Sequence, residues 1–289
     1  MEYKQYPVPK ELKQIVRYFW SYNASEPCSN KLVIKSFADK YPRLIFQDID
    51  NFEPIISDGN KMPSCYLSGL DTKPTEAFWY ESFSHFGVSF YPNALYKIWG
   101  INSVDLVDKT PDFFDIEKTI LPLKLKDAKS HEERVLVLSN YFFDKIQKKH
   151  VDFFSDFILS KKGIHDANDF TVLLKEFKIS ERQFQRKFKT EVGITYKNFS
   201  RLSRFEKALD LILKVATNDA SILENGKAQY TCMTNPQGGI IDDMIVYRKT
   251  ATEYLVVVNA SNIEKDWNWI KENNTFGVEM TDISDSTGL

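Results

Sequence analysis

The chain has 289 residues, a formal net charge of -2 and a hydrophobic share of 43%, so it is long enough for two packed domains. Its N-terminus lacks the apolar run of a secretory signal, and no stretch approaches the ~20 apolar residues of a membrane span, so we expect a cytoplasmic protein. Neither the four histidines nor the three cysteines (Cys28, Cys65 and Cys232) have the spacing of metal ligands, and no metal site or disulfide framework is expected.

Charge is distributed unevenly along the chain. Residues 161–214 carry about +6 and residues 215–289 about -6, whereas the first 160 residues are nearly neutral. A basic segment of this size fits a polyanion such as nucleic acid, and it equally fits solvated helices rich in lysine.

Residues 1–127 show short apolar runs broken by Pro, Gly, Asn and Asp, which is typical of β-rich structure with loops. In HFGVSFYP, the alternation of Phe86, Val88 and Phe90 with small residues predicts a half-buried strand that ends at Pro92. A helix is expected from about Asn93.

Residues 128–160 have apolar residues at helical spacing, which predicts two helices around His150. We interpret this segment as a helical bridge, and a dimer surface is a second interpretation. The apolar positions are Val135, Leu138, Phe142, Ile146, Phe153, Phe154, Phe157 and Ile158.

Residues 161–214 predict a helix-turn-helix segment. Asp169 is placed as the N-cap of a first helix, whose core face holds Phe170, Leu173, Leu174 and Phe177. After a short connection, Ser180 and Gln183 have the spacing of a capping box, so a second helix is expected to begin at Glu181.

The second helix is predicted to have an apolar and a polar side. Phe184 and Phe188 point inward, and one outward stripe holds Arg182, Gln185, Arg186 and Lys189. A helix-turn-helix with such a stripe places donors at base edges and phosphates in a major groove, although a solvated helix face would have the same pattern.

A third, long helix is expected after this one. Gly193 fits the left-handed position that follows a helix end, and Thr195 can cap the next helix. Arg201 and Arg204 on that helix are candidates for phosphate contacts. Its buried side is predicted to hold Phe199, Leu202, Phe205, Leu209 and Leu213.

The string ISERQFQRKFKTEVGITYKNFSRLSRFEKALDLIL resembles the first helix-turn-helix and connecting helix of the AraC/XylS family of bacterial transcription regulators. The segments YPVPKELKQIVRYFW and FGVSFYPNALYKIWGI are similar to the sensor-like domain of some members. The resemblance implies a sequence-specific regulator that reads double-stranded DNA with helix 181–190, responds to a small-molecule effector and pairs as a homodimer. The family's second helix-turn-helix is not found after Leu213.

The last part of the chain predicts strands and one helix. GKAQYTCM and IIDDMIVY are two strands joined across residues 235–239, and EYLVVVNA is a third, buried strand. Ser261 and Glu264 have capping-box spacing for the helix that follows. Asp242 and Asp243 begin a strand, so only one of them can face a pocket, and from spacing alone both are a solvated strand start.

From about Val215, the segment KVATNDASILENGKAQYTCMTNPQGGIIDDMIVYRKTATEYLVVVNASNIEKDWNWI resembles the glycine cleavage T-protein, a tetrahydrofolate-dependent aminomethyltransferase. The resemblance implies that Asp243 is the carboxylate beside the folate amine, that Tyr230 and Tyr247 line the pterin cavity, and that Asn259 lies nearby. Tetrahydrofolate is a cofactor only in this alternative. Because the pattern starts inside a domain and stops at Leu289, we expect no aminomethyltransferase activity from this polypeptide alone.

The expected fold class is α+β, with a β-rich sensor-like domain (1–127), a helical bridge (128–160), the first half of an AraC-type reader (161–214) and a partial α/β folate-enzyme fragment (215–289). The two patterns meet near residues 212–215 without a Gly, Ser or Pro linker, which natural fusions usually have. We interpret the junction as a chimeric reading frame. DNA binding is the first function hypothesis, and a folded but inactive fusion ranks close behind it. A folate-enzyme fragment is the alternative activity.

Overall fold

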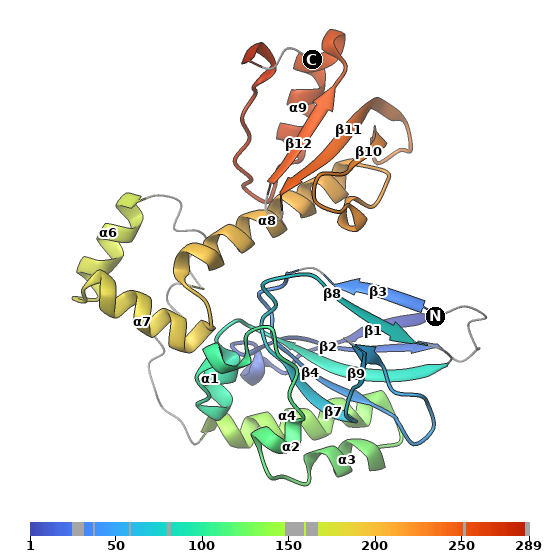
Figure 1. Ribbon diagram of the computed structural model, residues 1–289, viewed down its shortest axis with the longest axis vertical. Coiled ribbons are helices and arrows are strands. Elements are labelled where there is room, and N and C mark those ends of the chain that lie inside the picture. The colour runs from blue at the N-terminus through green and yellow to red at the C-terminus, as the bar shows by residue number, and fades with distance from the viewer. Residues whose placement is uncertain are drawn as a thin grey trace. The chain divides into compact units, whose positions relative to one another are not determined.

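The computed structural model shows an α+β protein with a β-rich N-terminal part, as predicted (Figure 1). It forms two compact units, Met1–Tyr196 and Lys197–Leu289. The four predicted domains divide the chain more finely, and their boundaries stay predictions. The structure describes residues 1–24, 32–36, 38–57, 59–79, 82–147, 159, 167–250 and 253–286.

The first unit is built on a five-stranded antiparallel sheet of order β1-β2-β9-β4-β7. The central strand β9 is buried on both faces, because Phe86 and Ser89 each have 0% exposure. The predicted strand is therefore confirmed, whereas its predicted half-burial is wrong. The strands are β1 (Glu2–Tyr6), β2 (Val16–Ala24), β4 (Arg43–Gln47), β7 (Cys65–Ser68) and β9 (Phe83–Phe90).

A four-stranded sheet of order β3-β8-β5-β6 completes the β-rich part. Phe83 of β9 and Met62 are buried in a cluster against which Ala77 of β8 packs, so the two sheets share apolar contacts. The strands are β3 (Leu32–Ser36), β5 (Ile56–Ser57), β6 (Asn60–Lys61) and β8 (Thr75–Trp79).

Helices cover the other face of the five-stranded sheet, as Figure 1 shows for α3 and α4. Phe142 of α4 contacts Phe90 of β9, with ring centroids 5.4 Å apart, and joins the largest apolar core. Asn93 is the N-cap of α1, at the predicted start. The elements are η1 (Lys10–Leu12), α1 (Ala94–Trp99), η2 (Ser103–Leu106), α2 (Phe113–Ile116), α3 (Leu121–Asp127) and α4 (His131–Gln147).

The first helix predicted for the bridge is α4. The second, with its apolar positions Phe153 to Ile158, lies outside the described residues, as do Cys28, His150 and His165. Two helices follow in the same unit, α6 (Ala167–Glu176) and α7 (Glu181–Val192). The predicted N-cap at Asp169 is wrong, because α6 begins two residues earlier and contains it.

The second unit consists of a long helix, a three-stranded antiparallel sheet of order β10-β11-β12 and a short helix. Its elements are α8 (Tyr196–Val215, whose first residue belongs to the first unit), η3 (Ala220–Ile222), β10 (Ala228–Thr234), β11 (Ile240–Thr250), β12 (Glu253–Val258), η4 (Ala260–Asn262), α9 (Ile263–Asn273) and η5 (Ser284–Ser286). The three strands are those predicted, although β12 is only partly buried.

The end of α8 is part of the core of the second unit. Leu211, Ile212 and Val215 are buried with Met233 and Met244 of the sheet, and α9 packs against the same cluster. The helix runs without a break through the predicted junction at 212–215. Leu213, predicted as buried, is 40% exposed, because the sheet contacts the neighbouring side of the helix.

Among the described residues, the helices are all too short or too polar to cross a membrane.

Candidate functional sites

Helix α7 is capped at both ends by residues next to it in the sequence. Ser180 Oγ accepts a hydrogen bond from the Gln183 amide at 3.3 Å, and Gln183 Oε1 accepts one from the Ser180 amide at 3.0 Å. This confirms the predicted capping box, which satisfies amides that have no partner within the helix. Gly193 ends the helix in the left-handed conformation, also as predicted.

The inner side of α7 is aromatic. Phe184 and Phe188 are both 0% exposed, and both rings contact Tyr196, with centroids 5.5 and 5.4 Å away. Phe170 of α6 packs edge-on against Phe184 at 4.8 Å. These contacts fix the rotation of α7 about its axis, and so decide which residues face solvent.

The outer side of α7 is basic. Arg182, Arg186 and Lys189 are exposed, and Gln185 is half-buried between them. The spacing places these four side chains on one stripe, which offers guanidinium, amide and ammonium donors to a polyanion. Their contact with DNA stays a prediction.

Arg201 and Arg204 are exposed on α8, in the second unit. Their predicted role in phosphate contacts stays a prediction.

The acidic pair on β11 is divided between the two faces of the sheet, as the alternation of a strand requires. Asp242 is 9% exposed and lies on the face that α9 covers. It accepts hydrogen bonds from Lys265 Nζ and Asn259 Nδ2, both at 2.9 Å, and from Asn262 Nδ2. The ion pair with Lys265 and these hydrogen bonds hold the pKa of Asp242 well below its usual range.

Asp242 therefore ties the beginning of α9 to the sheet. The predicted capping box of Ser261 and Glu264 is wrong, because the N-cap of α9 is Asn262 and its side chain binds Asp242 instead of the helix. Sequence reasoning missed Lys265 and Asn262, since their partner Asp242 lies 23 and 20 positions away on a strand.

Asp243 faces the opposite, open side of the sheet. It accepts hydrogen bonds from Tyr230 Oη at 2.6 Å and from Asn259 Nδ2 at 2.9 Å. The hydrogen bond to the carboxylate raises the pKa of Tyr230. Tyr247 lies on the same face, but four residues along β11 at about 3.4 Å per residue, and does not join this group.

The structure thus brings together three of the four residues predicted for a folate site, which we call the Asp243 cluster (Tyr230, Asp243 and Asn259). Tyr230 is 61% exposed, so the cluster is open to solvent. Around it, half-buried apolar side chains of the same face are Cys232, Ile245, Leu255 and Val257.

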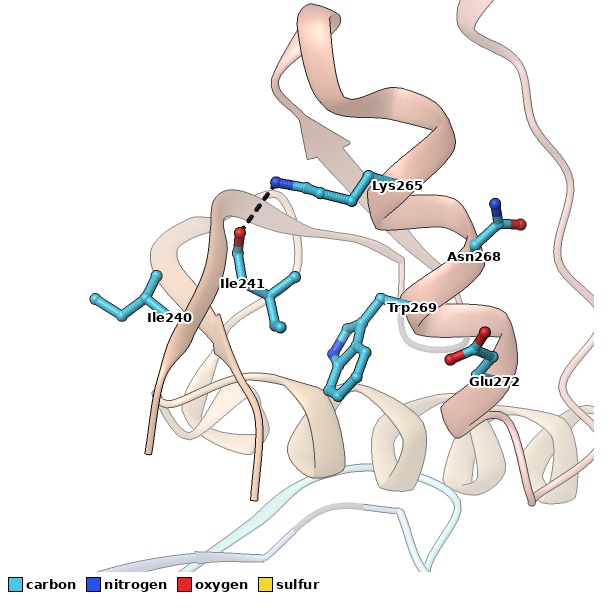
Figure 2. A pocket seen from close by; sticks show the side chains of 6 residues that line it. All are labelled: Ile240, Ile241, Lys265, Asn268, Trp269 and Glu272. Carbon is cyan, nitrogen blue, oxygen red and sulfur yellow. Dashed lines mark hydrogen bonds between the residues drawn. The ribbon is translucent and has the colours of Figure 1, made fainter. Parts of the chain in front are cut away.

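A separate pocket of about 440 Å³ lies between the start of β11 and α9 (Figure 2). Lys265 Nζ donates to the Ile241 carbonyl there, at 3.0 Å. The pocket contains no residue of the Asp243 cluster. Its lining residues are Ile240, Ile241, Lys265, Asn268, Trp269 and Glu272.

Among solved structures, two of ToxT from Vibrio cholerae are similar at a low level. One has a TM-score of 0.33 and 9% identity, and the match covers 73% of this chain and 84% of ToxT. The other has a TM-score of 0.30 and 11% identity, and its match covers 66% of this chain and 80% of the ToxT chain.

Known proteins resemble the two ends of the chain separately. Residues 186–289 match the GCVT N-terminal domain, and residues 4–112 match a domain of unknown function, DUF6597. The aminomethyltransferase of Flavobacterium psychrophilum is 58% identical over 84 residues, which are 29% of this chain and 23% of that protein. The aminomethyltransferase of Bacteroides fragilis is 53% identical over 79 residues, which are 27% of this chain and 22% of that protein.

The chain thus spans less than a quarter of the length of these relatives. The match to the GCVT N-terminal domain begins within α7, upstream of the predicted junction at 212–215. The C-terminal part of this chain is therefore similar to the GCVT N-terminal domain and to aminomethyltransferases, and its N-terminal part is similar to a domain whose function is unknown.

Proposed function

We propose that this chain is a transcription regulator of the AraC type that binds double-stranded DNA with α7. The observation that carries the proposal is the exposed stripe of Arg182, Arg186 and Lys189 on a helix held from behind by buried aromatic rings. A rigid helix loses little conformational freedom when it enters a groove, so its charged groups act with little entropic cost.

Each side chain of the stripe has a role that its chemistry suits. Arg186, at the centre, can donate two hydrogen bonds to guanine, and Gln185 can bind adenine in the same way. Arg182 and Lys189, together with Arg201 and Arg204 of α8, are assigned to phosphates, which supply affinity without sequence preference. A small-molecule effector of the N-terminal domain, homodimer pairing and a cytoplasmic location remain predictions.

Fluorescence anisotropy of the full chain tests this proposal, with labelled DNA from its own upstream region and a scrambled duplex, at low and physiological salt. Arg186→Ala should weaken binding to the upstream DNA by about 1–3 kcal/mol and reduce the preference over scrambled DNA. Lys73→Ala removes the same charge from an exposed site in the β-rich part and is the control. Equal affinity of wild type and Arg186→Ala for both duplexes would contradict the proposal.

A second candidate function is tetrahydrofolate binding by the Asp243 cluster, as in a fragment of an aminomethyltransferase. The hydrogen bonds of Tyr230 and Asn259 to one carboxylate support it, since they hold an acceptor in place for a ligand amine. Tyr247, on the same face, is the fourth residue assigned to this site. The proposal is limited to binding, because the relatives are more than four times as long as the shared segment.

Thermal unfolding with and without tetrahydrofolate tests the second candidate. A ligand at 100 times its dissociation constant stabilises a protein by about 2.7 kcal/mol, which should appear as a higher melting temperature. Asp243→Asn should abolish the shift, whereas Asp285→Asn, at an exposed site of the same unit, should keep it. A shift of equal size in wild type and Asp243→Asn would exclude the cluster as the binding site.

A further inference from the structure

The C-terminal end of α7 is buried, in contrast to its basic stripe. Glu191, Val192 and Ile194 are 7%, 1% and 6% exposed. This end of the helix contacts α1 and η2 of the β-rich part, and all these elements belong to the first unit. The helix proposed to read DNA therefore has one end anchored in the N-terminal domain.

A buried hydrogen bond makes this anchor specific. Ser103 Oγ, at the start of η2, donates to the main-chain carbonyl of Glu191 at 2.8 Å. Carbonyl groups in the last turn of a helix have no partner within the helix, so one from elsewhere must satisfy them. Ser103 is 5% exposed, so water cannot easily replace its hydroxyl group.

Gly193 brings the two segments close together. Its φ of +106° is unfavourable for a residue with a side chain, and a Cβ atom there would lie 2.9 Å from Val107 Cγ2 and 3.0 Å from the Ser103 carbonyl oxygen. Any larger residue would have to push η2 away from α7. The left-handed turn and the close packing thus both require glycine.

We propose that η2, together with Val107 directly after it, is a positioning contact through which the N-terminal domain fixes α7 for DNA binding. This inference rests on the DNA-binding function proposed above. The contact holds the buried C-terminal end of α7 and leaves Arg182 and Arg186 exposed, so it orders this helix without covering its basic stripe. A rearrangement of η2 would alter the freedom of α7 directly, and thereby the affinity for DNA.

Two pairs of variants test the contact. Gly193→Ala is compared with Gly59→Ala, which also has a positive φ but no atom within 4 Å of the added Cβ. Ser103→Ala is compared with Ser68→Ala, another serine of 5% exposure that donates to a main-chain carbonyl. Hydrogen exchange of peptides covering residues 181–196 measures the order of α7, and anisotropy measures DNA affinity.

We expect Gly193→Ala and Ser103→Ala to speed exchange in α7 and to weaken DNA binding, each by about tenfold, while both controls stay near wild type. Unchanged exchange in α7 would overturn the positioning contact. Faster exchange with unchanged DNA affinity would show that the contact does not serve binding. If the wild type itself fails to bind DNA, the proposed function and this role fall together, while the exchange data still decide whether η2 orders α7.

Discussion

The two units differ in how their sheets are covered. In the first, β9 is buried on both faces, by helices on one side and by the cluster shared with the second sheet on the other. In the second, β11 has one face packed on α8 and α9, while Ile245 on the other face stays half-exposed in the part that the structure describes. One unit thus encloses a complete core, and the other presents an open face beside the Asp243 cluster.

The largest effect should come from the enclosed core of the first unit. Phe86 is 0% exposed and stacks on His131 with ring centroids 5.7 Å apart. Phe86→Ala should lower the free energy of unfolding by about 3–5 kcal/mol, because it leaves a cavity that β9 cannot close. Urea unfolding with hydrogen exchange of each unit measures this. Leu123→Ala, at a 60% exposed position, should change it by less than about 0.5 kcal/mol.

Neighbouring residues of β11 test the open face directly. Met244 is 2% exposed on the covered side, so Met244→Ala should cost about 2–4 kcal/mol in the same unfolding measurement. Ile245→Ala, one residue further on the open side, should cost less than about 1.5 kcal/mol, because its side chain is already half in water. Equal losses at both positions would mean that the open face is covered in solution, as by a second copy of the chain.

The stability of the two units should also depend on pH in opposite directions, with smaller effects than the core substitutions. Burial raises the pKa of Asp266 in α9 to about 6, so the folded state keeps a proton that the unfolded state releases near pH 4. This contribution makes the second unit more stable as the pH falls from about 6 to 4. Burial lowers the pKa of His131 in the first unit to about 4, which makes that unit less stable as the pH falls from 6.5.

Asp266→Asn should therefore stabilise the second unit at pH 7.5, by no more than about 3 kcal/mol, and flatten its stability between pH 4 and 6. Hydrogen exchange of peptides from residues 260–275 at several pH values measures both. Asp285→Asn, at an exposed position, is the control. A variant that is less stable than wild type at pH 7.5 would show that the pair with Lys265, 3.7 Å away, outweighs the burial of the carboxylate.

In the first unit, the buried Asp71 opposes the histidine effect, because burial raises its pKa to about 6. His85, whose pKa burial lowers to about 3, acts in the same direction as His131. His85 and His131 therefore each lower the stability of the first unit as the pH falls, and Asp71 offsets part of that loss. His131→Gln should reduce the acid-induced loss of stability of the first unit. The effect should be smaller than the stabilisation expected from Asp266→Asn, because His131 is partly exposed. Hydrogen exchange of peptides from residues 131–147 at several pH values measures it.

Local signals were sufficient to predict the ends of α7. The capping box of Ser180 and Gln183 and the left-handed Gly193 depend on residues within four positions of one another, so the sequence displays them directly. The strands β10 and β11 were predicted for the same reason, from the turn between them. Most of the helix-turn-helix and the C-terminal hairpin were therefore predictable.

Contacts between distant residues were not predictable in this way. Ser103 and Glu191 lie 88 positions apart, and Lys265 reaches Asp242 from another element. Neither pair follows a periodic pattern. Leu213 was misplaced for a related reason: periodicity upstream placed it on the buried stripe, whereas the sheet of the second unit packs on Leu211 and Ile212.

Helix α8 offers a different view of the predicted junction at residues 212–215, because it runs through that point without a break. Leu202, Phe205, Ile212 and Val215 are all buried, at intervals that keep to one side of a helix with 3.6 residues per turn. A splice inside such a helix needs no linker, provided that it preserves the phase of the apolar side. One residue inserted before Ile212 would rotate the rest of the helix by about 100° and turn Ile212 out of its core. Whether such a helix can fold therefore depends on the helical spacing of its buried apolar residues.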